Sequence, residues 1–203
     1  MVVEILADFF VQLIEQLGYV GIFILMVLES MIAPVPSELV MPFAGYVSAL
    51  GRLDFILVNV AALLGSLVGS LISYAAGKFL GRDIILHYGK FLGLSKKHLE
   101  WTEKWFSSHG NSTVLIGRFI PVVRHLISIP AGISQMRKRE FIAMTLIGAA
   151  LWNGFLAAAG FLLKDQYGLI AEYSSVLDIL VVIALLAAVV YWFVHKNKKS
   201  KQH

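Results

Sequence analysis

Four ionisable side chains lie inside stretches of sequence that are otherwise apolar: Glu29, Glu38, Arg118 and Arg124. A charged side chain at the centre of a bilayer costs roughly 2.5–3.5 kcal/mol, so four unpaired groups would cost on the order of 10 kcal/mol. A chain of this size has little stability to set against that penalty. The four groups must therefore pair with one another, face water or bind a charged ligand, and charges inside a membrane are functional candidates by default.

The signs of these charges indicate the chemistry. The two acids lie in one apolar region and the two arginines in another. A pair of arginines offers planar, bidentate donors that suit a phosphate group, and a glutamate removed from water can hold a proton near neutral pH. The pattern predicts the movement of an anionic headgroup coupled to protonation, with Arg118 and Arg124 on the phosphate and Glu29 and Glu38 as proton carriers. The alternative is two internal salt bridges that only lock the regions together.

Other chemistries find less support. No glycine precedes the Gly-Lys-Phe at 77–79 at P-loop spacing, no Gly-x-Ser-x-Gly elbow is present, and the chain contains no cysteine. His125 adjoins Arg124 and either joins the site or serves packing. Three histidines recur every eleven residues, too far apart for a local metal motif, and we expect them on a surface helix: His87, His98 and His109. The sequence therefore predicts a transporter rather than an enzyme, with no cofactor and no metal.

Membrane helices must position these charges, because the chain is strongly apolar. Of its 203 residues 58% are hydrophobic and 15% are charged, with a mean hydropathy of +0.78, whereas a soluble domain carries about 25% charged residues. Three stretches are long enough to cross a bilayer core of roughly 30 Å: residues 55–79, 141–163 and 176–194. The start lacks the basic region of a cleavable signal, so we expect these stretches in the mature protein. Gly65 and Gly69 have a spacing typical of closely packed membrane helices.

Two further apolar regions, residues 18–50 and 111–134, are interrupted by prolines. The helical pieces beside Pro34, Pro36 and Pro121 are each too short to span the bilayer at about 1.5 Å per residue. Proline removes a backbone donor and leaves carbonyl groups without partners, which lipid cannot supply. We therefore expect two re-entrant hairpins that turn at these prolines. The competing interpretation is two ordinary helices in each region.

The distribution of Lys and Arg predicts the orientation, since short loops rich in these residues stay in the cytoplasm. Residues 1–51 contain none, residues 78–104 contain six, residues 137–139 contain three, and the tail at 195–203 is strongly basic. We expect the three basic segments, including the C-terminus, on the cytoplasmic side. The first hairpin then opens outward and the second opens inward.

The two interrupted regions share a pattern. Ala44-Gly45 begins ten residues after Pro34, and Ala131-Gly132 begins ten residues after Pro121. The spanning segment that follows each region ends in Ala-Ala-Gly, at 75–77 and at 158–160. Equivalent units that enter from opposite sides form an inverted-topology repeat, which secondary transporters use to build a site at the membrane midplane.

The predicted fold is an all-α polytopic membrane protein that forms a single membrane-embedded domain over residues 1–203. Its centre is an inverted repeat of two re-entrant helical hairpins, each followed by a transmembrane helix. A C-terminal transmembrane helix and interfacial amphipathic helices complete it. One interfacial helix is expected at 1–17, and another within the cytoplasmic segment 82–110, where it is expected to end at Gly110.

Two motifs closely resemble the DedA family, also called SNARE-associated Golgi or VTT-domain proteins. The first comprises Glu29, Pro34-Val-Pro36-Ser-Glu38 and Ala44-Gly45, and the second comprises Gly117-Arg118-Phe119-Ile120-Pro121-Val-Val-Arg124, Ala131-Gly132 and Met136. The similarity covers about residues 18–165. The paired motifs make it specific.

The resemblance implies facing re-entrant hairpins and a lipid transporter. Bacterial members of the family are implicated in returning lipid carriers across the cytoplasmic membrane, chiefly undecaprenyl phosphate and in some cases phosphatidylethanolamine, often with proton-motive-force dependence. Eukaryotic relatives are lipid scramblases. Glu29 and Glu38 occupy the family's two membrane acids, and Arg118 and Arg124 its two essential arginines. Many members have aspartate at the position of Glu38, so this chain adds a methylene to the reach of that carboxylate.

We therefore expect a multi-pass flippase of a bacterial cytoplasmic membrane that moves a phosphate-bearing lipid, above all undecaprenyl phosphate, coupled to protons. Pro34, Pro36 and Pro121 are expected to keep the hairpin tips open. The alternatives are a phosphatidylethanolamine flippase or scramblase, a proton-coupled small-ion transporter, a lipid phosphatase and a structural scaffold. The expected partners are the lipid substrate, membrane lipids and a coupling ion, with no nucleic acid, and a homo-oligomer is left open.

Overall fold

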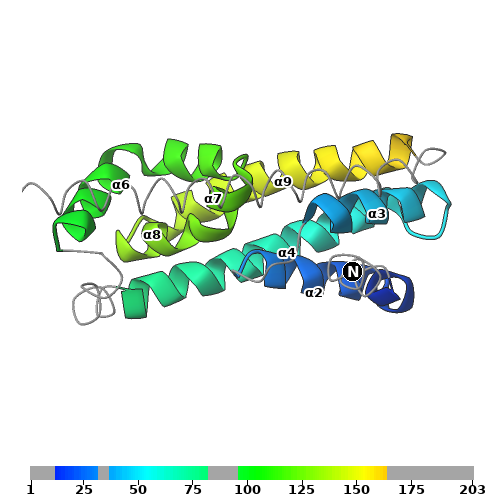
Figure 1. The fold of residues 1–203 in the computed structure, drawn as a ribbon, viewed down its shortest axis with the longest axis horizontal. Helices are drawn as coiled ribbons and strands as arrows, with labels where there is room; N and C mark the ends of the chain where they lie inside the picture. The colour runs from blue at the N-terminus through cyan, green and yellow to red at the C-terminus, as the bar shows by residue number, and fades with distance from the viewer. Residues whose placement is uncertain (1–11, 32–36, 82–95, 164–203) are drawn as a thin grey trace, which may run out of the picture. The chain divides into compact units, whose positions relative to one another are not determined.

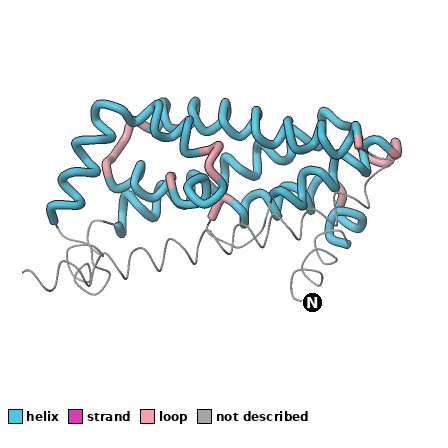
Figure 2. Tube along the Cα trace, turned by 45° about the horizontal axis from the view of Figure 1, so that its top comes forward, coloured by secondary structure: helices cyan, strands magenta, loops and turns pink. Residues whose placement is uncertain are grey.

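The computed structural model describes residues 12–31, 37–81 and 96–163, and every regular element in these ranges is a helix, joined by short loops (Figure 2). These residues belong to one unit of the chain, Met1–Lys164. Several predicted features lie outside the described residues: the first part of the interfacial helix at 1–17, Pro34 and Pro36, residues 82–95 of the cytoplasmic segment, the spanning helix at 176–194 and the tail at 195–203.

The helices follow one another along the chain (Figure 1), and three of those described exceed twenty residues. They are α2 (Tyr19–Glu29), α3 (Ser37–Ala49), α4 (Phe55–Ala76) with its π-helical continuation η1 (Gly77–Gly81), α6 (Lys96–Gly117), α7 (Pro121–Leu126), α8 (Ser128–Ile133) and α9 (Lys138–Leu162). The segment Phe55–Gly81 and the helix Lys138–Leu162 are long and apolar enough to cross a membrane. They correspond to two of the three predicted spans. Both carry large exposed apolar side chains, such as Ile56 and Phe155, as helices that face lipid do.

The long helices α4 and α9 lie side by side and run in opposite directions (Figure 1). Phe55 at the start of α4 packs edge-on against Phe161 near the end of α9, with ring centroids 5.3 Å apart. Tyr74 near the end of α4 packs against Phe141 near the start of α9, with centroids 4.8 Å apart. This antiparallel arrangement is what two crossings in opposite directions require.

The helix α2 packs along α4, with the close approach that its glycines predict. Gly65 lies against the backbone of Phe23, and Gly69 lies against that of Val27. A side chain at either glycine would force the two helices apart. The predicted role of these small residues in packing is therefore confirmed.

The helix α3 packs on α9, which follows the other interrupted region. A Cβ on Gly45 would collide with the backbone of Ala157, and a Cβ on Gly160 would collide with that of Pro42. Both contacts bring backbone against backbone, so α3 and α9 touch without intervening side chains.

The helix α8 makes the matching contacts with α4 and η1. Gly132 lies against the backbone of Tyr74, and Gly77 lies against that of Ile129. The packing of α3 and α8 is reciprocal, since each of these two helices rests on the long helix that follows the other interrupted region. The Ala-Gly and Ala-Ala-Gly patterns of the sequence are the points at which this contact is made.

The predicted helix end at Gly110 is wrong. The helix α6 continues through this residue to Gly117. The Met136 side chain lies beside Gly110, and a Cβ there would come within 3.4 Å of its sulfur. Tertiary packing therefore supports the helix at a residue whose own preference disfavours it. The piece predicted to begin at residue 111 is the end of α6 rather than a separate helix.

The region after Pro121 contains two short helices where we expected one piece. Pro121 occupies the first turn of α7, where its missing N–H leaves no bond unmade. The helix ends at Leu126, and α8 follows Ile127. Pro130 has no N–H to donate to the Leu126 carbonyl, so the α-helical hydrogen bonds cannot continue across this point.

A tight turn separates α8 from α9. The helix α9 begins at Lys138, three residues before the predicted start at residue 141. Gln135 has φ +53°, the only positive φ of a non-glycine residue in the described ranges. The Met136 N–H donates to the Ala131 carbonyl at 3.1 Å and the Gln135 N–H donates to the Gly132 carbonyl at 2.9 Å. This is the Schellman pattern of helix ends.

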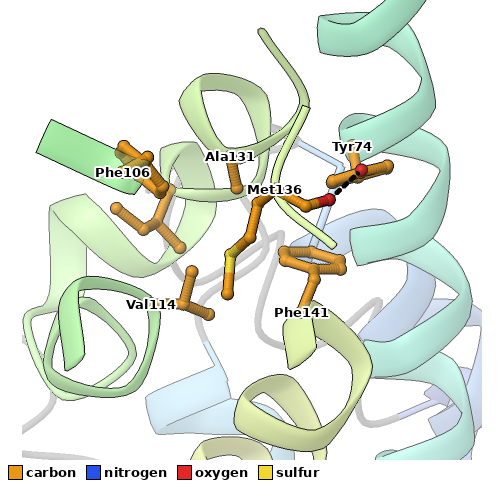
Figure 3. Packing of buried hydrophobic residues seen from close by; sticks show 7 residues of the cluster. Tyr74, Phe106, Val114, Ala131, Met136 and Phe141 are labelled. Atoms are coloured by element: carbon orange, nitrogen blue, oxygen red, sulfur yellow. Dashed lines mark hydrogen bonds between the residues drawn. The ribbon is translucent and has the colours of Figure 1, made fainter. Parts of the chain in front are cut away.

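A buried cluster fastens this turn to the long helices (Figure 3). The Tyr74 hydroxyl donates to the Met136 carbonyl at 2.5 Å. The cluster draws residues from α4, α6, α8 and α9: Tyr74, Phe106, Val114, Ile127, Ala131, Met136 and Phe141. The end of α6 and the helix α8, which flank the segment with the two arginines, are thereby held against α4 and α9.

Replacing Gly160 with alanine should lower the thermal stability of the detergent-solubilised protein, because the new Cβ would overlap the Pro42 backbone and overpacking costs about 1–3 kcal/mol. Gly154→Ala in the same helix is the matched control, since its Cβ would meet only Asn59 Oδ1 at 3.7 Å. We expect this control to equal the wild type or to gain about 0.5–1 kcal/mol from helix propensity. Midpoints of thermal aggregation provide the comparison, and equal midpoints for the two variants would contradict the close packing.

Candidate functional site

Three of the four predicted charged residues meet in one cluster. Glu29 ends α2, Glu38 lies in the first turn of α3, and Arg124 lies in α7. Arg124 forms an ion pair with Glu29, and its Nη1 lies 3.7 Å from Glu38 Oε1. Glu29 and Arg124 are 3% and 5% exposed, whereas the Glu38 side chain is 27% exposed. The pairing of acids with an arginine is therefore found at Arg124.

Two serines next to the acids complete this cluster. Ser30 Oγ donates to Glu29 Oε2 at 2.9 Å. Ser37 Oγ accepts a hydrogen bond from Arg124 and lies 3.4 Å from Glu38 Oε2. Buried carboxylates and guanidinium groups need such additional partners, because one ion pair leaves most of their hydrogen-bonding capacity unused.

Arg118 has a different environment. It follows α6 directly and is 5% exposed. Its Nη2 donates to three hydroxyl groups, at 2.9 Å to Ser70, 3.0 Å to Thr145 and 3.4 Å to Ser128. Within the described ranges it forms no ion pair. Hydroxyl groups orient a guanidinium group but do not neutralise it, so Arg118 is a buried positive charge without a negative partner in this part of the chain.

Three N–H groups around the arginines have no hydrogen-bond acceptor among the described residues, although each is buried: Arg118 Nε, Arg124 Nη1 and Trp152 Nε1. Their side chains line one recess between the helices, together with Glu29, Ser66, Gly148, Ala149 and Asn153. The recess is narrow in this conformation, with a cavity volume of about 10 Å³, which is room for about one water molecule. Buried N–H groups are almost always paired in proteins, so this concentration of free donors favours a ligand rich in acceptor oxygens.

The long helices supply the polar lining. Gly148 of α9 makes room for Arg118, since a Cβ there would lie 2.9 Å from the Arg118 Cβ and Cγ. Asn153 Nδ2 donates to Ser66 Oγ at 3.2 Å and joins α9 to α4. Ser66, Ser70 and Ser73 are buried and recur at helical spacing along α4. Sequence reasoning missed these hydroxyl groups, although their spacing within an apolar span was a usable signal.

The histidines divide between the site and the surface. His125 Nδ1 lies 2.9 Å from the Glu29 carbonyl oxygen and 3.7 Å from its Oε1, so this residue joins the site. His109 stacks on Trp105 with ring centroids 4.7 Å apart in α6. His87 lies outside the described residues, and among those described no three His, Cys, Asp or Glu side chains are grouped to hold a metal ion.

Comparison with known proteins places the site within a matched region. Residues 14–162 match the family model described as the VTT domain. The chain is 35% identical to the protein named "Alkaline phosphatase-like protein" of Lactococcus lactis subsp. lactis, over 94% of this chain and 95% of that protein. It is 33% identical to "Undecaprenyl phosphate transporter A" of Staphylococcus aureus, over 94% of this chain and 97% of that protein.

A more distant relative carries the family's name. "Protein DedA" of Escherichia coli is 25% identical over 94% of this chain and 90% of that protein. No solved structure matches the chain significantly. The VTT-domain match covers nearly three quarters of the sequence and contains both acids and both arginines of the site. The chain therefore belongs to the DedA family of VTT-domain proteins.

Proposed function

We propose that this protein is a transporter that moves a phosphate-bearing lipid, undecaprenyl phosphate, across a bacterial cytoplasmic membrane in a proton-coupled cycle. The observation that carries the proposal is Arg118, a buried guanidinium group with three hydroxyl partners and, in the described residues, no carboxylate. A phosphate monoester supplies both the negative charge and the acceptor oxygens that this environment lacks. Two relatives that bear the name undecaprenyl phosphate transporter A support the choice of lipid.

The proposed architecture is the inverted repeat of two re-entrant hairpins. Its support is the reciprocal packing, in which Gly45 of the first region lies against α9 and Gly132 of the second lies against α4. The antiparallel course of α4 and α9 agrees with it. In this arrangement both hairpin tips meet near the middle of the membrane, with the basic segments and the C-terminus on the cytoplasmic side. The phosphate enters between the tips while the polyprenyl chain stays in the bilayer.

The two arginines have different tasks in the proposed cycle. Arg118 attracts the phosphate in every state, because its partners among the described residues are neutral hydroxyl groups. Arg124 and Glu29 form a buried ion pair. Arg124 can therefore bind the phosphate only after this ion pair breaks. A proton on Glu29 removes the negative charge that binds Arg124 and lets the guanidinium group turn to the phosphate. Glu38, which is partly open, is the second proton carrier.

Replacing Arg118 with lysine should slow transbilayer movement of undecaprenyl phosphate by about tenfold or more, because an ammonium group cannot reproduce the forked donor geometry. Arg124→Lys should act in the same direction. The measurement is the leaflet-resolved accessibility of undecaprenyl phosphate in proteoliposomes. Arg137→Lys is the control, since that side chain is 85% exposed and pairs with Glu140 outside the recess.

The same assay separates the rival functions. Rates for Arg118→Lys and Arg124→Lys equal to the wild type would contradict the phosphate role of the arginines. Equal movement of phosphatidylethanolamine would indicate a general phospholipid flippase or scramblase, and solute flux independent of lipid identity would indicate an ion transporter. Release of inorganic phosphate would indicate the hydrolase that the Lactococcus lactis name suggests.

Replacing Glu29 with glutamine should remove the contribution of this carboxyl group to the pH dependence of phosphate binding, because glutamine mimics the protonated acid. We expect the wild type to bind undecaprenyl phosphate more tightly as the pH falls through the range in which Glu29 takes up a proton, because protonation of Glu29 releases Arg124. The variant should show only the pH dependence that ionisation of the lipid phosphate causes, and it should lose the stimulation of transport by a proton gradient. Ionisation of the lipid phosphate affects both proteins equally, so the difference between them reports Glu29.

Glu140→Gln is the matched control for this experiment. Glu140 is a surface acid of α9 paired with Arg137, so its variant should keep the pH dependence of the wild type. A Glu29→Gln protein that binds with the same pH dependence as the wild type would show that this carboxyl group does not couple protons to binding.

A further inference from the structure

Trp152 occupies a position in the recess that the proposed cycle does not use. It lies in α9, and its ring faces the Arg124 guanidinium group, with Cζ 5.4 Å from the ring centroid. The Phe119 ring meets it edge-on at 6.4 Å. Its indole Nε1 is buried and has no acceptor among the described residues. The side chain thus combines a fixed aromatic face with an unused donor.

An unused indole N–H at this position needs an explanation. Buried tryptophan nitrogens usually find an acceptor. Trp152 lines the same recess as Arg118, whose Nε is also buried without an acceptor in the described part of the chain. Free donors of two different side chains therefore surround one space, and an oxygen-rich ligand would satisfy both.

We propose that Trp152 is a third residue that binds the lipid headgroup, with its indole N–H donating to a phosphate oxygen. This inference rests on the proposed function of the recess. Because the indole nitrogen can donate but cannot accept a hydrogen bond, the ligand group at this atom must be an acceptor. An ammonium group has only donors and cannot bind this N–H, whereas the phosphate oxygens of a monoester or of a phosphodiester can accept from it.

The aromatic face has a separate task. Arg124 is held on one side by Glu29 and on another by the Trp152 ring. When protonation of Glu29 breaks its ion pair with Arg124, the cation–π contact with Trp152 keeps the guanidinium group in the recess. Trp152 therefore places the second arginine beside the oxygen atoms that its own N–H binds.

Trp152→Phe separates the two tasks, because phenylalanine keeps an aromatic face and removes the donor. We expect the variant to bind a short-chain polyprenyl monophosphate about 10- to 100-fold more weakly than the wild type, as loss of one hydrogen bond to a charged group predicts. Binding of the matching polyprenyl alcohol should not change. Trp101→Phe is the control, since Trp101 lies in α6, is 63% exposed and does not line the recess. Equal phosphate affinity of Trp152→Phe and wild type would overturn the inference.

A second measurement uses the native tryptophan and does not depend on the fold of Trp152→Phe. In a protein whose other tryptophans (Trp101, Trp105 and Trp192) are replaced by phenylalanine, emission reports Trp152 alone. Polyprenyl monophosphate should shift this emission with the same midpoint as binding, and the polyprenyl alcohol should not. Binding of the phosphate without a shift would reject the role of Trp152 and leave the proposed function standing. Absence of phosphate binding by the wild type would reject the proposed function itself.

Discussion

The buried ion pair between Glu29 and Arg124 is the contact on which the site depends, because it joins α2 to α7 and hence one interrupted region to the other. Removing two charges from water costs several kcal/mol per ion, and mutual attraction offsets this only with good geometry and further hydrogen bonds. Ser30 and Ser37 supply those bonds. A pair of this kind adds little to stability, yet loss of one partner would leave an isolated buried charge. The ion pair therefore depends on the surrounding helices, which hold both side chains in the required geometry.

Close contacts at glycine residues hold these helices in position. Without a hydrophobic driving force between helices in lipid, association relies on close van der Waals packing. Gly45 and Gly160 bring α3 against α9, and Gly77 and Gly132 bring α8 against α4. The helices α3 and α8 thus each rest on a long helix from the opposite half of the chain. Glu38 lies in the first turn of α3, and Arg124 lies in α7 just before α8, so the register of a few backbone contacts determines whether acids and arginines meet.

The charged residues and the two membrane-spanning helices could be predicted from the sequence, because a charge within an apolar stretch and an unbroken apolar run are both easy to recognise. It did not reveal the partners of Arg118, because Ser70 and Thr145 are ordinary residues of membrane helices whose role depends on contacts across the chain. The continuation of α6 through Gly110 was also hidden, since it follows from packing against Met136. Local patterns therefore identified the charged residues more readily than the packing that surrounds them.

A site that takes up and releases an anion cannot keep both arginines paired or both unpaired. If carboxylates neutralised both, no charge would attract the phosphate, and if neither were neutralised, nothing would compete for the arginines when the phosphate must leave. Hydroxyl groups surround Arg118, while Arg124 is bound to Glu29. A ligand shifts a conformational equilibrium only by its difference in affinity for the two states. In the proposed cycle, that difference arises at Arg124, because one proton on Glu29 decides whether the phosphate meets one guanidinium group or two.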